Sequence, residues 1–224
     1  MTGSVGDGRV ATAGRVVAGV GALAAVGAAA YLASGQHRRI GARPEEVSGV
    51  LPGDDLFPQA GVVSTRAISI DAPPDYVWPW VAQMGQDKGG FYSYTWAENL
   101  VGCDITNADR IVQEWQSPQV GDPFRLHPDL CLEIAVVDPP HALVVCNPEP
   151  GGDPSMGFDF SWAFVIDPEP TGRGVRLIVR ERYLPYGRAA EASIASVGVV
   201  SAAMSVGMLR GIRGRAERLF HSGI

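Results

Sequence analysis

The sequence has few cysteines, few histidines and no excess of positive charge. Its three cysteines, Cys103, Cys131 and Cys146, show no CxxC or other metal-ligand spacing, and an odd, sparse count fits a reducing compartment better than a disulfide framework. The four histidines are scattered, so the sequence predicts no metal site and no cofactor. Lys plus Arg number 18 against 24 Asp plus Glu, and the resulting net charge of -6 argues against nucleic acid as a partner.

Motifs for nucleophilic catalysis and for phosphate binding are also missing. The chain has no GxSxG elbow, and its Gly-Gly pairs at 89–90 and 151–152 lack the GK[ST] or GxGxxG context. It is instead rich in apolar residues, with 46% hydrophobic against 19% charged. At 224 residues, this composition predicts one domain with a sizeable core, with or without an appendage.

Residues 16–33 form an uncharged run of mostly alanine, glycine and valine. At ~1.5 Å per residue a helix of this length spans ~27 Å, close to a bilayer core, although Ala and Gly make insertion marginal. Three interpretations stay open: a membrane anchor, a signal peptide cleaved near 26–28 that would release a secreted protein, and a soluble helix. The cysteine count favours the first. We therefore expect a tail and anchor helix over residues 1–40 and a single-pass membrane protein with a cytoplasmic domain.

Beyond the anchor, composition divides the chain at residue 61. Residues 41–60 carry three prolines and an acidic pair, which predicts a linker before a folded domain at 61–224. Apolar residues at helical spacing predict a helix after Pro74, and the capping-box spacing of Thr95 and Glu98 predicts a second short helix. Alternating apolar residues predict strands at 65–71, 131–136, 142–146, 158–166 and 175–183.

Residues 189–220 contain no proline and predict a long final helix. Its uncharged stretch at 192–209 leaves open a second membrane span, but the serines there favour a helix buried against a sheet. Strands joined by short turns must pair antiparallel. A curved antiparallel sheet wrapped around the long helix buries the apolar faces of both, so the predicted fold class is α+β.

Six stretches of the domain follow a family pattern. They are TRAISIDAPPDYVWPWVAQMG at 65–85, GGFYSYTWAENLVG at 89–102, NADRIVQEWQ at 107–116, VGDPFRL at 120–126, RLIVRERY at 176–183 and MLRGIRGRAE at 208–217. In these stretches the chain resembles the START-like, helix-grip superfamily, in its SRPBCC branch of polyketide cyclase/dehydrase-like and lipid-transfer-like proteins. The resemblance implies a helix-grip fold with an apolar cavity between sheet and final helix. No catalytic residue set is shared across the superfamily, so none is carried over.

Two charged residues share apolar strand faces. Arg66 alternates in phase with Ile68 and Ile70, and Glu181 in phase with Leu177 and Val179. In a helix-grip sheet the first and last strands are neighbours, so this pair could meet inside the cavity and orient a polar ligand head. An alternation offset by one residue would instead place both in solvent.

The aromatic residues are concentrated between positions 76 and 96, which hold seven of the eighteen in the chain. They are explained either as ordinary core or as the lining for an apolar ligand. The predicted ligand-binding residues are Arg66, Trp80, Tyr92, Tyr94, Trp96, Trp162, Glu181 and Tyr183.

The predicted function is binding, and possible transfer, of a hydrophobic or amphipathic small molecule or lipid in an internal cavity near the membrane. The alternative is a cyclase/dehydrase-type enzyme that acts on a polyketide-like substrate in the same cavity. Such an enzyme needs positioned acid or base groups, for which Glu98, Tyr94 and Glu181 are the candidates.

Overall fold

The computed structural model describes residues 31–100, 102–149, 157–170 and 172–223. The chain divides into two compact units, Met1–His37 and Arg38–Ile224, and the second unit contains the sheet and the final helix. Of the anchor predicted at residues 16–33, all but the last three positions lie outside the described residues.

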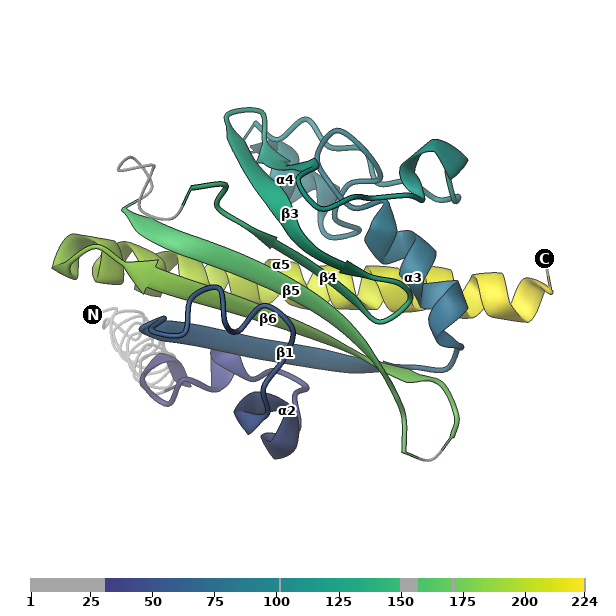
Figure 1. Cartoon of the computed structure of the whole chain (residues 1–224), viewed down its shortest axis with the longest axis horizontal. Coiled ribbons are helices and arrows are strands. Elements are labelled where there is room, and N and C mark those ends of the chain that lie inside the picture. Colours follow the sequence, from purple (N-terminus) through teal and green to yellow (C-terminus); the bar gives the residue numbers. More distant parts are fainter. Residues whose placement is uncertain (1–30, 101, 150–156, 171, 224) are drawn as a thin grey trace, which may run out of the picture. The chain divides into compact units, whose positions relative to one another are not determined.

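In chain order the described residues form the following elements (Figure 1): η1 Gln36–Arg38, α2 Pro44–Ser48, β1 Val62–Ile70, α3 Pro74–Ala82, α4 Thr95–Leu100, η2 Gln113–Trp115, β2 Pro123–His127, β3 Leu130–Asp138, β4 Ala142–Cys146, β5 Phe158–Pro168, β6 Val175–Pro185 and α5 Arg188–Ser222. Among these helices none is by itself both long and apolar enough to cross a membrane. The two parts of α5, Arg188–Ala195 and Gly198–Ser222, reach that threshold only together, across a bend of 41°.

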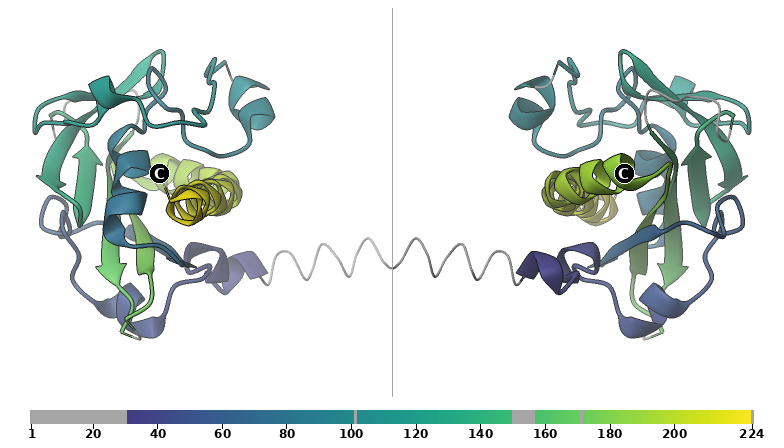
Figure 2. Two further views of the ribbon diagram at one scale, coloured as in Figure 1. Left: turned by 90° about the vertical axis from the view of Figure 1, so that its right-hand side faces the viewer. Right: turned by 90° about the vertical axis from the view of Figure 1, so that its left-hand side faces the viewer.

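The strands form one antiparallel sheet in the order β1-β6-β5-β4-β3-β2, and α5 packs across one face of it (Figures 1 and 2). The first and last strands are neighbours, as predicted. Register shifts in the β2–β3 and β3–β4 pairings mark bulges, which bend strands and raise their twist. The α+β, helix-grip fold class is therefore confirmed, and the uncharged stretch of α5 is the part of a helix that packs on a sheet.

Residues 41–60 lie against the face of the sheet opposite α5, so the prediction of a linker there is wrong. Arg176 and Arg180 of β6 point to this face, and their guanidinium groups need acceptors because they are buried. Arg176 binds Glu46 of α2, with Nε 2.6 Å from Oε1, and Arg180 donates to the Glu46 carbonyl oxygen at 2.6 Å and to Asp54. The compact unit thus begins at Arg38 instead of residue 61.

Apolar contacts join the same segment to the sheet. Leu51 and Leu56 pack on a small cluster that includes Ala67 of β1 and Ile178 of β6. The acidic and proline-rich composition of residues 41–60 suggested solvent exposure. The carboxylates of Glu46 and Asp54 instead face the arginines of β6, which alternate with the apolar residues of the inner face.

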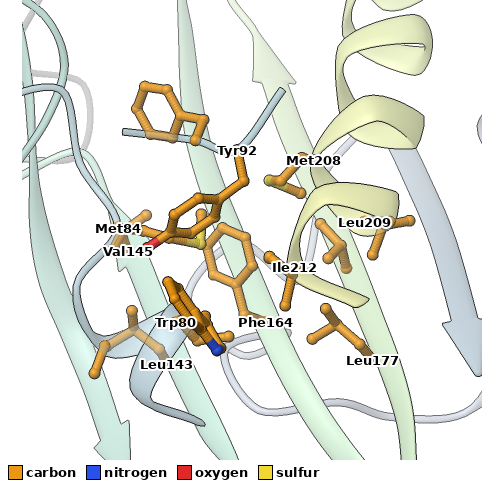
Figure 3. Packing of buried hydrophobic residues seen from close by; sticks show 14 of the residues in the cluster. Trp80, Met84, Tyr92, Leu143, Val145, Phe164, Leu177, Met208, Leu209 and Ile212 are labelled. Carbon is orange, nitrogen blue, oxygen red and sulfur yellow. The ribbon is translucent and has the colours of Figure 1, made fainter. Parts of the chain in front are cut away.

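The inner face of the sheet is solidly packed at one end. Trp80 and Tyr92 meet edge to face, with ring centroids 5.8 Å apart, and Figure 3 shows them packed among Met84, Phe164 and Ile212. The guanidinium of Arg215 on α5 lies over both rings, 4.8 Å from the Tyr92 centroid. These contacts account for both aromatic residues as core.

Two glycines of α5 let the 91–94 loop cross the helix closely. A Cβ at Gly211 would overlap the Tyr92 carbonyl oxygen, and one at Gly207 would lie 2.8 Å from the Tyr94 ring. Side chains there would push the loop away from the helix. The loop leads into α4, so these glycines position α4 over the inner face.

Candidate functional site

A cavity of about 280 Å³ lies between the sheet and the 200–208 stretch of α5, next to the packed end of the interior. It is mainly apolar and is closed on one side by α4 and the loops that flank it. Its lining residues are Phe91, Ser93, Ala97, Glu98, Cys103, Ile105, Leu126, Phe160, Trp162, Glu181, Tyr183, Val200, Ser201, Met204, Ser205 and Met208. The volume lies just below the ~300–1,000 Å³ typical of small-molecule sites, so the cavity suits a compact molecule better than a two-chain lipid.

Glu181 enters the cavity wall as one partner of a buried ion pair. Its Oε1 lies 2.9 Å from Nη1 of Arg66, and the two side chains are 4% and 0% exposed. Arg66 stands opposite Val179 in the β1–β6 register, so Glu181 is its diagonal neighbour on the same face. Of the two alternatives that the sequence left open, the structure has the one in which these side chains meet in the interior, and not the one in which both project into solvent. Their role toward a ligand stays a prediction.

Helix α5 completes the coordination of Glu181. Ser201 donates to its carboxylate at 2.7 Å and Ser205 at 3.2 Å, while Tyr183 Oη donates to Oε2 at 3.2 Å. Burial, with the negative charge of Glu181 beside it, raises the pKa of Tyr183 well above its ordinary value, which keeps the phenol protonated. A buried charge with this many partners is fixed in position, and it forms a rigid polar patch in an otherwise apolar wall.

Glu98 of α4 lines the same cavity with a different environment. Glu98 is only 5% exposed, and within the part of the chain that the structure describes neither of its carboxyl oxygens has a hydrogen-bond partner. Burial raises the pKa of the Glu98 carboxyl, which favours its neutral form. The expected capping interaction with Thr95 is replaced: Thr95 Oγ1 accepts from Asn107 Nδ2 at 2.9 Å.

Two further polar groups belong to this cavity. Trp162 lines it, and its indole N–H is buried without an acceptor among the described residues. Cys103 follows α4, and burial together with the nearby Glu98 carboxyl raises the pKa of its thiol. A raised pKa suppresses the thiolate form, so Cys103 is a poor nucleophile.

The predicted ligand-binding residues separate into three groups. Trp162, Glu181 and Tyr183 line the cavity, and Arg66 lies behind Glu181. Trp80 and Tyr92 belong to the packed core. Tyr94, in the loop that crosses α5, and Trp96, in α4, are outside the lining, at 40% and 73% exposure.

Several lining residues were not singled out in the sequence. Phe91 and Phe160 pack against Trp162 with tilted rings, whose centroids are 6.0 and 6.5 Å from that of Trp162. Phe160 had a signal, since it alternates in phase with Trp162. Ser201 and Ser205 had one too, because these two serines, four residues apart, lie on one face of the uncharged stretch of α5.

No protein-family model and no curated protein matches the chain. Similar solved structures include protein MLL2253 from Mesorhizobium loti, at 16% identity and a TM-score of 0.41, covering 70% of this chain and 98% of that one. The di-domain ARO/CYC StfQ of the steffimycin biosynthetic pathway matches at 14% and 0.45, covering 76% and 54%, so the chain spans about half its length. Norcoclaurine synthase from Thalictrum flavum, in complex with dopamine and hydroxybenzaldehyde, matches at 14% and 0.41, covering 73% and 88%. Likenesses of this strength concern the fold alone, and the helix-grip fold rests on the strand order and the closing helix.

Proposed function

We propose that the protein binds a compact hydrophobic or amphipathic molecule in the cavity between α5 and the sheet. The observation that carries this proposal is the division of the interior. One end is packed around Trp80 and Phe164, while the other leaves a partly open cavity of about 280 Å³, lined mainly by apolar side chains that include aromatic and methionine residues. An empty apolar cavity lowers stability. Burial of apolar ligand surface there is worth ~25 cal/mol per Å².

The test is a substitution that fills the cavity from its edge. Ala97 of α4 lines the cavity and is only half-buried, so Ala97→Phe places a ring inside without removing an existing interaction. Ala203→Phe, on an exposed position of α5, is the matched control. Binding of naphthalene-sized probes is measured by equilibrium dialysis, and native mass spectrometry of the purified protein detects any co-purified molecule.

We expect the wild type and Ala203→Phe to bind such probes and Ala97→Phe to lose at least tenfold in affinity. Thermal unfolding shows whether each variant is folded. Equal binding by all three proteins would place the probe outside this cavity and overturn the proposal, as would a wild type that binds no apolar probe at all.

A cyclase-type enzyme is the second candidate, and one observation favours it. A neutral carboxyl in an apolar cavity, as at Glu98, is the arrangement that lets a carboxylic acid act as a proton donor near neutral pH. Incubation with an aromatic polyketone, followed by mass spectrometry, tests this candidate. A product formed by wild type but not by Glu98→Gln would support it, and an unchanged substrate would count against it.

Membrane attachment through residues 16–33 stays a proposal from the sequence alone. Its support is the length and lack of charge of that run. Fractionation of the full chain with a carbonate wash tests it. Retention in the membrane pellet supports an anchor, and full release into the soluble fraction rejects one.

A further inference from the structure

The cavity contains two polar groups whose hydrogen bonds are not made within the described residues. Glu98 enters from α4 and Trp162 from β5, so the two come from elements that are far apart in the sequence. Buried polar groups normally have partners, and leaving one without a partner is destabilising. Groups of this kind that line a hollow therefore point to a ligand that supplies the missing partners.

The chemistry of Trp162 limits what that ligand can be. An indole N–H is a donor only, so it needs an acceptor atom. An ammonium group has no acceptor and cannot satisfy it. The neutral form of Glu98, which burial favours, likewise presents an O–H donor.

The other carboxylate of the cavity does not call for a cationic ligand. Glu181 already has Arg66 at 2.9 Å and hydroxyl donors from Ser201 and Ser205. Its charge is thus balanced by the protein itself. A cationic ligand would lose its hydration on entering the cavity, and no unpaired negative charge in the described part of the wall would offset that cost.

We propose that the bound molecule is neutral and largely apolar and carries a carbonyl-type oxygen that accepts a hydrogen bond from Glu98, Trp162 or both. This inference rests on the proposed function and adds to it the polar contacts through which the ligand is recognised. Glu98 acts here as a binding residue that discriminates ligands by their oxygen atoms. The apolar wall supplies affinity, and the two donors supply orientation.

Three probes of equal ring size separate the possibilities. Methyl naphthyl ketone carries the acceptor, isopropenylnaphthalene replaces its oxygen by a methylene group of similar shape, and naphthylethylamine is protonated at neutral pH. Affinities are measured by equilibrium dialysis with the full chain. We expect the wild type to bind the ketone about five- to tenfold more tightly than the hydrocarbon, and the amine most weakly.

Variants assign the preference to the two donors. Glu98→Gln keeps an N–H donor and retains the preference, while the double variant Glu98→Leu/Trp162→Phe has neither donor and binds ketone and hydrocarbon within about twofold. Thermal unfolding confirms that the double variant is folded, and its hydrocarbon binding confirms that the cavity is intact. If the double variant does not fold, the pH comparison of wild type with Glu98→Gln decides the matter.

The pH dependence gives that second readout. The titratable and charged groups around Glu98 are Cys103 on its own loop, Glu181 with Arg66 on the sheet, Tyr183 on β6, and His127 of β2 beside Gly102. Glu98 donates only in its protonated form, so the part of the ketone preference that Glu98 supplies falls as the pH rises through the raised pKa of that carboxyl. Glu98→Gln cannot titrate, so its preference stays constant over the same range.

Each result bears on one level of the proposal. Equal binding of ketone and hydrocarbon to the wild type overturns the inference but leaves a working apolar site. Preferential binding of the amine, or a ketone preference that survives in the double variant, overturns the inference in the same way. A wild type that binds none of the three probes overturns the proposed function as well.

Discussion

The Arg66–Glu181 pair shows how a charged residue is tolerated on an apolar face. Both side chains are almost fully buried, and each has its charge matched by the other. Breaking such a pair leaves one charge without compensation, which costs about 3–5 kcal/mol, whereas replacing both partners by apolar residues is often neutral. Each partner is therefore needed as long as the other is present, while the net contribution of the pair to the free energy of unfolding is small.

We predict that Arg66→Leu lowers the free energy of unfolding by about 3 kcal/mol or more, because Glu181 then remains buried with hydroxyl donors only. The double variant Arg66→Leu/Glu181→Leu recovers most of this loss. Urea unfolding monitored by circular dichroism measures both. A loss below ~0.5 kcal/mol in the single variant would mean that the pair is solvated in solution.

Glu98 gives a pH dependence of the opposite kind from an ordinary surface carboxylate. Its folded pKa is raised above the ordinary value of 4.5, so its contribution to stability is fully present below that value and is lost as the pH rises through the folded pKa. We predict that Glu98→Gln, which cannot ionise, gains stability relative to wild type as the pH increases from about 4.5 toward neutral. Urea unfolding across this range measures the difference, and a difference independent of pH would contradict the prediction.

Glu46 is the matching case on the other face of the sheet. Burial alone would raise the pKa of Glu46, but hydrogen bonds from Arg176 and from the Arg43 backbone outweigh it and hold the pKa below the ordinary value. Stability from Glu46 is thus present above the unfolded pKa and is lost as the pH falls through the folded one. The stability contributions of the two carboxyl groups change with pH in opposite directions. Glu46 has hydrogen-bond partners that lower its pKa, whereas Glu98 is buried in the cavity wall without such partners among the described residues and its pKa is raised.

At the scale of elements, strand β6 shows what the sequence could and could not predict. The sequence predicted that Leu177, Val179 and Glu181 share one face of the strand, and the family resemblance implied that β6 lies next to β1. The partners of the arginines between them could not be predicted, because acceptors in residues 41–60 lie more than a hundred positions away. Periodicity identifies a face, but the segment that covers it is set by tertiary contacts.

The cavity residues show the same limit. The sequence indicated Trp162, Glu181 and Tyr183 because strand alternation places them on the inner face. Tyr94 and Trp96 were predicted to bind the ligand, but both lie outside the cavity lining. No periodic pattern governs the loop that holds Tyr94, and α4, which holds Trp96, has only six residues. That loop is fixed by its contact with Gly207 and Gly211 of α5, which composition alone does not reveal.

The close crossing at α5 gives a prediction for that element. A methyl group at position 211 would overlap the Tyr92 carbonyl oxygen, which belongs to backbone and cannot move alone. We predict that Gly211→Ala lowers stability by about 1–3 kcal/mol despite the better helix propensity of alanine. Its control is Gly214→Ala, where a Cβ meets only the end of the Arg218 side chain at 3.3 Å.

The control should be neutral or raise stability by up to ~1 kcal/mol, because alanine is the better helix former. Thermal unfolding of the two variants beside the wild type measures the contrast. Equal stability of both would mean that the loop yields without loss, and that the glycines do not hold α4 in position.

At the scale of the molecule, the boundary of the folded unit is testable. Truncation to residues 38–224 retains the segment that covers the outer face of the sheet, so we predict cooperative unfolding of this fragment. Truncation to 61–224 exposes Ala67 and Ile178 and removes the acceptors of Arg176 and Arg180. The shorter fragment should be insoluble or should unfold at a much lower temperature, as followed by circular dichroism. A fragment 61–224 as stable as 38–224 would restore the linker interpretation.

The division of the interior into a packed end and a hollow end has a consequence for natural variation. Trp80, Phe164 and Ile212 hold the chain folded from one end, whereas the probe-sized space is bounded by other stretches of the same strands and helix. Substitutions at positions 97–98, 160–162 and 200–204 can therefore change which ligand the cavity binds while the fold is kept. Homologous chains should conserve the residues of the packed end and vary at the cavity positions, so that the same fold binds different ligands.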